Sequence, residues 1–136
     1  MLFFGYTTSR PFGGFCMPVP AQNSCLREYC DKNKGKYVLP QLEHKYHNCY
    51  MQLFSTLNSC SQNSAILMYS ILMMEMNKDK TKYFFEIVKK KNVQIHFVLE
   101  NKIANSLEEF YKMSQNYKFK KFIISRKALK ERILKT

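Results

Sequence analysis

Hydroxyl groups and one arginine follow the first apolar segment of the chain. Thr7, Thr8, Ser9 and Arg10 come directly after the run Leu2–Tyr6. An arginine at the end of a strand can bind a phosphate or carboxylate with two parallel hydrogen bonds, and a neighbouring serine can donate to the same oxygen or act as a nucleophile. Arg10 and Ser9 are therefore candidate catalytic residues of an anion site. The structural alternatives are an internal ion pair for Arg10 and a turn cap for Ser9.

Amide and hydroxyl side chains occur at two further positions expected near the same edge. Gln22 and Asn23 lie in the first turn of a predicted helix, and Tyr69 and Ser70 end an apolar strand. Helix N-termini and the carboxyl ends of parallel strands are where α/β proteins place anionic ligands. We expect these four residues to line a ligand pocket. Asn23 as a helix cap and Tyr69 as a packed ring are the structural alternatives.

Two carboxylates are expected at the same sheet edge. Glu43 follows the second predicted strand and Glu100 follows the fourth. A carboxylate at this edge can act as a general base or bind sugar hydroxyls. Both residues are candidates for a catalytic role, with a surface salt bridge as the alternative.

The cysteines and histidines do not form a recognisable metal motif. The five cysteines are odd in number, with no Cys-x-x-Cys spacing, which is typical of reduced thiols in a cytoplasmic protein. A zinc site would rest only on His44, His47 and Cys49, so we expect no metal and no other cofactor. His96 lies among apolar residues of a strand, which favours a packed, hydrogen-bonded side chain over a catalyst.

Alternating strands and helices must position these residues. The predicted strands are Leu2–Thr8, Lys36–Leu42, Ala65–Tyr69 and Val93–Leu99. The predicted helices are Gln22–Lys34, Tyr50–Cys60, Lys78–Lys91 and one opened by the capping box Ser106–Glu109. This order predicts an α/β sandwich with a mainly parallel four-stranded sheet.

The positive charge is concentrated at the C-terminus. The net charge is +12, and residues 112–136 contain nine basic residues and one acidic residue. We expect an α/β domain over residues 1–116 and a basic amphipathic helix over residues 117–136. Such a helix can hold nucleic acid, anionic lipid or a phosphorylated substrate, or form a homodimer. The sequence contains no apolar run long enough for a transmembrane segment and no signal peptide, so we expect a cytoplasmic protein.

Several blocks resemble the sporadic carbohydrate cluster protein family. They cover much of residues 3–105 in the order Gly5–Phe12, Pro20–Asn23, Leu26–Cys30, Met68–Ser70 and His96–Glu100. Members of that family are small proteins encoded in bacterial islands for surface polysaccharide such as lipopolysaccharide O-antigen. The resemblance implies this context and no particular reaction.

A weaker resemblance is to the catalytic domain of serine recombinases. A strand with a Gly5-Tyr6 start, a loop with serine and arginine, a helix start with Gln22 and a later apolar strand occur in the same order. Where the family has an Asp-Arg-x-x-Arg stretch, this chain has Ser70-Ile71-Leu72-Met73-Met74. The family also has an arginine two residues before the nucleophile, and that position is occupied here by Thr7 or Thr8. Because those arginines stabilise the phosphoryl transition state, the resemblance implies the fold but not strand exchange.

The expected function is surface-carbohydrate biosynthesis, with a sugar phosphate or nucleotide sugar as ligand. Arg10 would hold the phosphate. The alternatives are a resolvase-like nucleic-acid-binding protein without strand exchange and a non-catalytic interaction protein. The sequence does not decide whether the protein is an enzyme.

Overall fold

A five-stranded sheet forms the centre of the computed structural model, which describes residues 1–14, 16–40, 42–43 and 49–116. The strand order is β3-β1-β5-β6-β7. The four parallel strands are β3 (Lys36–Val38), β1 (Leu2–Gly5), β5 (Ala65–Met68) and β6 (Gln94–Phe97). The prediction of a single α/β domain dominated by parallel strands is thus confirmed.

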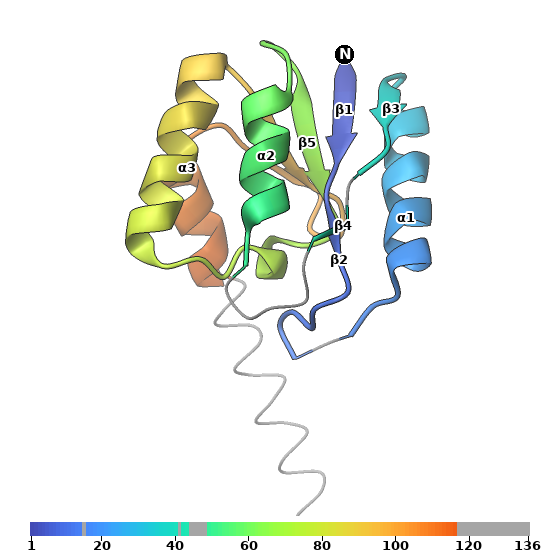
Figure 1. The fold of residues 1–136 in the computed structure, drawn as a ribbon, viewed down its shortest axis with the longest axis horizontal. Helices are drawn as coiled ribbons and strands as arrows, with labels where there is room; N and C mark the ends of the chain where they lie inside the picture. The colour runs from blue at the N-terminus through green and yellow to red at the C-terminus, as the bar shows by residue number, and fades with distance from the viewer. Residues whose placement is uncertain (15, 41, 44–48, 117–136) are drawn as a thin grey trace, which may run out of the picture.

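Helices cover the two faces of the sheet unequally. In Figure 1, α1 (Val19–Lys32) lies on one side, and α2 (Met51–Ser59) and α3 (Lys78–Lys91) lie on the other. Residues 107–116 form a further helix, which packs on the same side as α2 and α3 through Phe110. The expected helices in the described part of the chain are present, with bounds that differ by up to three residues.

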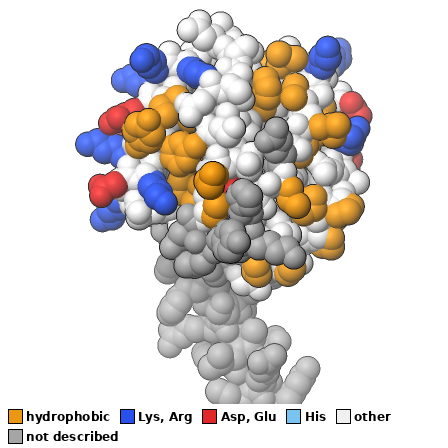
Figure 2. Space-filling model, in the orientation of Figure 1, with side chains coloured by type: hydrophobic (Ala, Val, Ile, Leu, Met, Phe, Trp, Pro, Cys, Tyr) orange, Lys and Arg blue, Asp and Glu red, His pale blue; other side chains and the backbone are white. Residues whose placement is uncertain are grey.

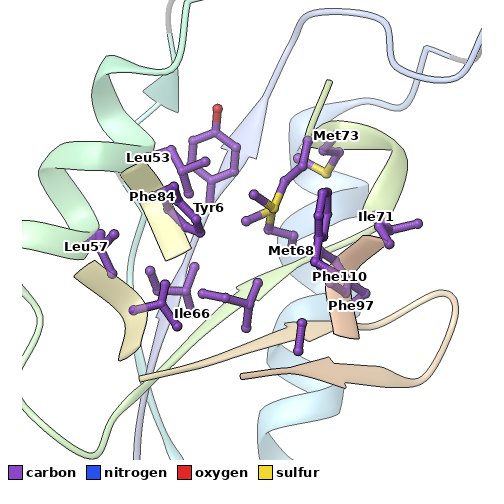
Figure 3. Packing of buried hydrophobic residues seen from close by; sticks show 14 of the residues in the cluster. Tyr6, Leu53, Leu57, Ile66, Met68, Ile71, Met73, Phe84, Phe97 and Phe110 are labelled. Carbon is purple, nitrogen blue, oxygen red and sulfur yellow. The ribbon is translucent and has the colours of Figure 1, made fainter. Parts of the chain in front are cut away.

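Side chains of the central strand β5 point alternately to the two faces of the sheet, and both faces are buried. Ala65 and Leu67 pack towards α1, whereas Ile66 and Met68 join the larger core beneath α2 and α3. All four residues of β5 are fully buried, as expected for a parallel strand with helices on both faces. Figure 3 shows the larger core, in which the rings of Phe84, Phe97 and Phe110 surround the aliphatic side chains of the strands.

Two features of the sheet differ from the sequence prediction. β7 (Lys102–Ala104) adds an antiparallel fifth strand beside β6, which its sequence of three residues was too short to indicate. The first two predicted strands are each divided, and their second parts form a separate parallel pair of β2 (Thr7–Thr8) and β4 (Leu42–Glu43). In the second strand the break contains Pro40, which has no N–H to donate to a ladder. The predicted basic helix over residues 117–136 lies outside the described residues.

Hydrogen bonds close the ends of α2 and α3. Asn77 caps the start of α3 by accepting the Lys80 backbone N–H at 2.8 Å. Asn92 ends the helix in the left-handed conformation, with φ of 54°. The ammonium group of Lys91 donates to the carbonyls of Leu57, Asn58 and Cys60 at the end of α2, at 2.9, 2.5 and 3.1 Å. The carboxyl ends of the two helices are therefore joined.

Candidate functional site

The β2–β4 pair brings Glu43 beside the end of the first strand. Thr8 is the register partner of Glu43, and the Tyr6 hydroxyl donates to Glu43 Oε2 at 2.9 Å. Burial, together with the charge of Glu43, raises the pKa of Tyr6 far above its usual range. Tyr6 thus stays protonated and acts as a hydrogen-bond donor.

Glu43 also binds the start of α2. Its carboxylate accepts the backbone N–H of Gln52 at 3.0 Å and that of Leu53 at 3.2 Å. It also accepts the Cys49 thiol at 3.6 Å. The first N–H groups of a helix have no partner within the helix, and the helix dipole favours an anion there. Glu43 is only 1% exposed. Through these hydrogen bonds it connects β4 to the start of α2.

Arg10 bridges the loop after β2 to the start of the same helix. Its Nη1 donates to the Cys49 carbonyl at 2.6 Å. The guanidinium carbon lies 4.6 Å from the centroid of the Tyr50 ring, a cation–π geometry. Arg10 and Glu43 thus belong to one cluster, which also contains Tyr6, Cys49 and Tyr50.

Ser9 differs from its neighbours in having no internal partner. Its Oγ is buried and makes no hydrogen bond within the described part of the chain. The adjacent Thr8 is held by Gln22, whose Nε2 donates to the Thr8 carbonyl at 2.7 Å and to the Met17 carbonyl at 2.9 Å. Gln22 Oε1 accepts the Thr8 N–H at 3.3 Å. Gln22 therefore fixes the loop that presents Ser9.

Ser70 and Glu100 form a second cluster after β5 and β6. The Ser70 hydroxyl donates to Glu100 Oε2 at 2.9 Å, and the Ile71 N–H donates to Oε1 at 2.6 Å. Burial raises the pKa of Glu100, and these two hydrogen bonds partly offset the effect. They hold the short 3-10 helix η1 (Ile71–Met73), in which Ile71 and Met73 are buried.

The other two predicted pocket residues, Asn23 and Tyr69, use their side chains in contacts of their own. The Asn23 side chain accepts the Tyr37 hydroxyl at 3.0 Å and so joins α1 to β3. Tyr69 packs against Phe12, with ring centroids 6.2 Å apart. It also lines a groove of about 540 Å³ between α1 and the turn after β6. A ligand role for Asn23 and Tyr69 stays a prediction.

His96 has the packed, hydrogen-bonded environment expected from the sequence. Its Nδ1 lies 2.6 Å from the Tyr29 hydroxyl and its Nε2 lies 2.9 Å from Gln94 Oε1. Burial lowers the pKa of His96 to about 4, so the ring is neutral at pH 7. A neutral ring that accepts from Tyr29 and donates to Gln94 satisfies both contacts.

The structure therefore joins the predicted residues in pairs. It links Arg10 with Glu43 through Cys49, and Ser70 with Glu100 directly. Tyr6 and Tyr50, which complete the first cluster, were not singled out from the sequence. Tyr6 lies in an apolar strand, and Tyr50 precedes a helix without a distinguishing motif. Both become recognisable only through their distant partners.

Metal-binding groups are sparse in the part of the chain that the structure describes. No group of three or more His, Cys, Asp or Glu side chains there could hold a metal ion. His44 and His47, on which a zinc site would depend, lie outside the described residues. Among the helices described, none is long and apolar enough to cross a membrane.

The fold resembles the catalytic domains of site-specific recombinases. A resolvase family site-specific recombinase from Streptococcus pneumoniae superposes with a TM-score of 0.63 and 13% identity, over 99% of this chain and 97% of that one. The N-terminal catalytic domain of TP901-1 integrase has a TM-score of 0.55 and 12% identity, over 90% of this chain and 98% of that one. These similarities define a resolvase-like α/β fold, as the weaker sequence resemblance implied.

The sequence comparisons do not extend this likeness. No protein-family model matches the chain, and no curated protein matches it significantly. The resemblance to the sporadic carbohydrate cluster family therefore has no support from these comparisons.

Proposed function

We propose that this chain is a resolvase-like nucleic-acid-binding domain that does not exchange strands. The observation that carries the proposal is the excess of basic residues, 22 against 10 acidic ones, on a fold shared with recombinase catalytic domains. A net charge of +12 favours a polyanionic partner. The predicted helix over residues 117–136 would supply much of the electrostatic attraction.

The loop after β5 argues against strand exchange. Serine recombinases, whose fold the chain resembles, place arginines in this loop to stabilise the phosphoryl transition state. Here the loop begins with Ser70 and continues through η1 to Met74. Ile71, Met73 and Met74 are at most 6% exposed, and Glu100 binds Ser70 and the Ile71 N–H. The loop is therefore packed into the core and has no cationic group for a phosphate.

Fluorescence anisotropy with labelled duplex DNA tests the proposal. We expect binding at about 50 mM salt that weakens steeply as salt increases, since each phosphate contact adds about 0.9 to the logarithmic salt slope. Replacing Lys118, Lys120 and Lys121 together by glutamine should lower both affinity and slope. The matched control replaces Lys32, Lys34 and Lys36, which removes the same charge near the end of α1. Absence of binding at low salt would disprove the proposal, and strand cleavage would disprove its second part.

A second candidate is the binding of a sugar phosphate or nucleotide sugar beside Ser9. The observation that favours it is the buried Ser9 Oγ without a hydrogen-bond partner in the described residues, because such groups are rare without a ligand or water. In this alternative Ser9 and Arg10 would contact the phosphate, and Glu43 or Glu100 would serve as base. Thermal unfolding with a panel of sugar phosphates and nucleotide sugars should then show stabilisation that is lost in Ser9→Ala. Equal shifts in both proteins would exclude Ser9 from the site.

A third possibility is a non-catalytic homodimer that forms through residues 117–136. Gel filtration distinguishes it from a monomeric protein. We expect the full-length protein to elute as a dimer if this helix pairs, and as a monomer if it serves nucleic acid alone. The apolar residues of the segment include Phe119, Phe122 and Ile123. Their replacement by serine would abolish a dimer while leaving the charge unchanged.

A further inference from the structure

An open groove on the surface of α2, which reaches Lys80 of α3, has no part in the proposed function so far. Its volume is about 910 Å³, within the range of small-ligand sites. The α2 side is formed by Met51, Phe54, Ser55 and Asn58, which share one helix face because of their spacing. Lys80 contributes from α3. Figure 2 shows hydrophobic side chains on the surface over these two helices, with charged side chains at the margin.

Phe54, which lines the groove, packs against Tyr83, an exposed residue of α3 beside it. The rings of Phe54 and Tyr83 are stacked, with centroids 5.9 Å apart and an interplanar angle of 29°. Phe54 is held from below by an edge contact to Phe84, with centroids 5.6 Å apart, and Phe84 is fully buried. Tyr83 nevertheless remains 58% exposed. Its ring is therefore fixed on one side and accessible to solvent.

Hydrogen bonds hold together the two helices that contribute to the groove. The contacts of Lys91 with three carbonyls at the end of α2 hold that helix to the end of α3. Asn92 Nδ2 adds a hydrogen bond to Asn63 Oδ1 at 2.6 Å. A preordered aromatic surface loses little conformational entropy when a ligand binds. These contacts fix the carboxyl end of α3 relative to that of α2.

The charges around the groove favour an anionic partner. α2 contains no charged residue, and Lys80 is the charged side chain that lines the groove. The first five residues of α3, around Lys80, contain three lysines against Asp79. The hydroxyl of Ser55 and the amide of Asn58 provide donors and acceptors beside the aromatic rings. An apolar ring, a cation and polar groups together match the base and the phosphate of a nucleotide.

We propose that the surface formed by this groove and the adjoining Tyr83 binds single-stranded nucleic acid, with an unpaired base on the exposed side of the Tyr83 ring and Lys80 as the phosphate contact. The proposal rests on the proposed nucleic-acid-binding function and names the form of nucleic acid that this surface recognises. In a duplex, both faces of each internal base are covered by neighbouring bases. Only an unpaired base offers a free face to the Tyr83 ring.

Anisotropy of the full-length chain with a labelled oligothymidylate of about 12 nucleotides tests this site. Tyr83→Ala should weaken binding roughly ten- to a hundred-fold, because base stacking contributes this much per aromatic ring, whereas Tyr83→Phe should retain the affinity. Leu99→Ala is the matched control, since Leu99 is also 58% exposed and lies in the other groove. Lys80→Gln should reduce the salt slope by about 0.7, and Lys102→Gln on β7 should not.

A fluorescent reporter gives an independent readout. The chain has no tryptophan, so Tyr83→Trp introduces a single one at the proposed stacking position. Its emission should be quenched on addition of the oligothymidylate, and that of Leu99→Trp should not. Because both positions are exposed, neither substitution is expected to unfold the protein, which thermal unfolding would verify.

The outcomes separate this proposal from the function on which it rests. If the full-length protein binds neither duplex nor single strand, the nucleic-acid function fails and this site with it. If it binds DNA while Tyr83→Ala and Lys80→Gln retain full affinity, the function stands and the groove is excluded. If Tyr83→Ala changes the elution volume in gel filtration but not the affinity, the groove is a protein contact and the proposal is overturned.

Discussion

The hydroxyl of Tyr6 donates to the carboxylate of Glu43 across 37 positions of sequence, at 2.9 Å and out of contact with solvent. Glu43 is at the same time an acceptor for backbone N–H groups at the start of α2. One carboxylate thus connects the first strand, β4 and a helix. This edge of the domain is held together by polar side chains that the sequence suggested for catalysis.

Removing the charge of Glu43 should destabilise the fold. Glu43→Gln replaces one acceptor oxygen by a donor, so at least one buried donor loses its partner, at a cost of about 2–3 kcal/mol in the free energy of unfolding. Glu28→Gln is the control, because its salt bridge to Lys32 is exposed and should contribute less than about 1 kcal/mol. Urea unfolding followed by circular dichroism measures both. Equal stabilities of the two variants would show that the Glu43 network adds no net stability.

The buried His96 should make the protein sensitive to mild acid. The pKa of His96 is about 4 in the folded protein against 6.5 normally, so the unfolded chain binds the proton more readily. Stability should be complete above about pH 6.5 and decline as the pH falls towards 4, by up to about 3 kcal/mol.

The contribution of His96 can be isolated by comparison with His96→Gln, which does not titrate. Unfolding curves at about pH 7, 5.5 and 4.5 should show the stability of the wild type falling relative to the variant. Glu100 is present in both proteins, so its opposite effect cancels in this comparison. Its raised pKa favours the folded state at low pH. A constant difference between the two proteins across this range would contradict the assignment.

Lys91 should contribute more to stability than its neighbours in the last turn of α3. Lys91→Met keeps the apolar stem but leaves the carbonyls of Leu57, Asn58 and Cys60 without this donor, so we expect a loss of about 1–2 kcal/mol. Lys90→Met removes an exposed lysine and should change the free energy of unfolding by less than about 0.5 kcal/mol. Thermal unfolding of the two variants is sufficient to distinguish them.

Glu100 should act through its hydrogen bonds rather than its charge. Glu100→Ala leaves the Ser70 hydroxyl and the Ile71 N–H without an acceptor and should cost about 2 kcal/mol. Glu100→Gln retains one acceptor oxygen and should cost less than half of that. Glu86→Ala, at an exposed position of α3, is the control for both. If Gln and Ala were equally destabilising, the carboxylate charge would be the dominant contribution.

The regular elements were largely predictable from local patterns. The apolar run that forms β5 indicated a strand buried on both faces, and α3 begins and ends where predicted. The serine half of the capping box forms, with the Ser106 hydroxyl accepting the Glu109 N–H at 3.3 Å, while Glu109 Oε2 accepts the N–H of Asn105 at 2.9 Å. β7 was not predicted because three residues, two of them exposed, carry little periodicity. Its existence depends on pairing with β6, a tertiary contact.

The candidate site was predictable in composition but not in connectivity. The polar residues expected at one sheet edge divide between two places: Glu43 lies in the separate β2–β4 pair, whereas Ser70 and Glu100 bind each other after β5 and β6. Their partners were not foreseen, since Tyr6 is 37 residues from Glu43 and Ser70 is 30 residues from Glu100. Residues this far apart meet only after the strand order is established.

The sequence alone determined where the helices and the four parallel strands of the main sheet form, because hydrophobic periodicity and helix caps act between residues a few positions apart. It also determined the strongly basic character of the chain. The tertiary structure decided which polar groups are used internally, because Glu43, Gln22 and Glu100 find their donors across elements that only folding brings together. It likewise decided that Phe54 and Tyr83, from two different helices, stack at the surface. Local sequence patterns specify the helices and strands. Hydrogen bonds and ring contacts form only between atoms a few ångströms apart, and the order and packing of the elements control which atoms come that close.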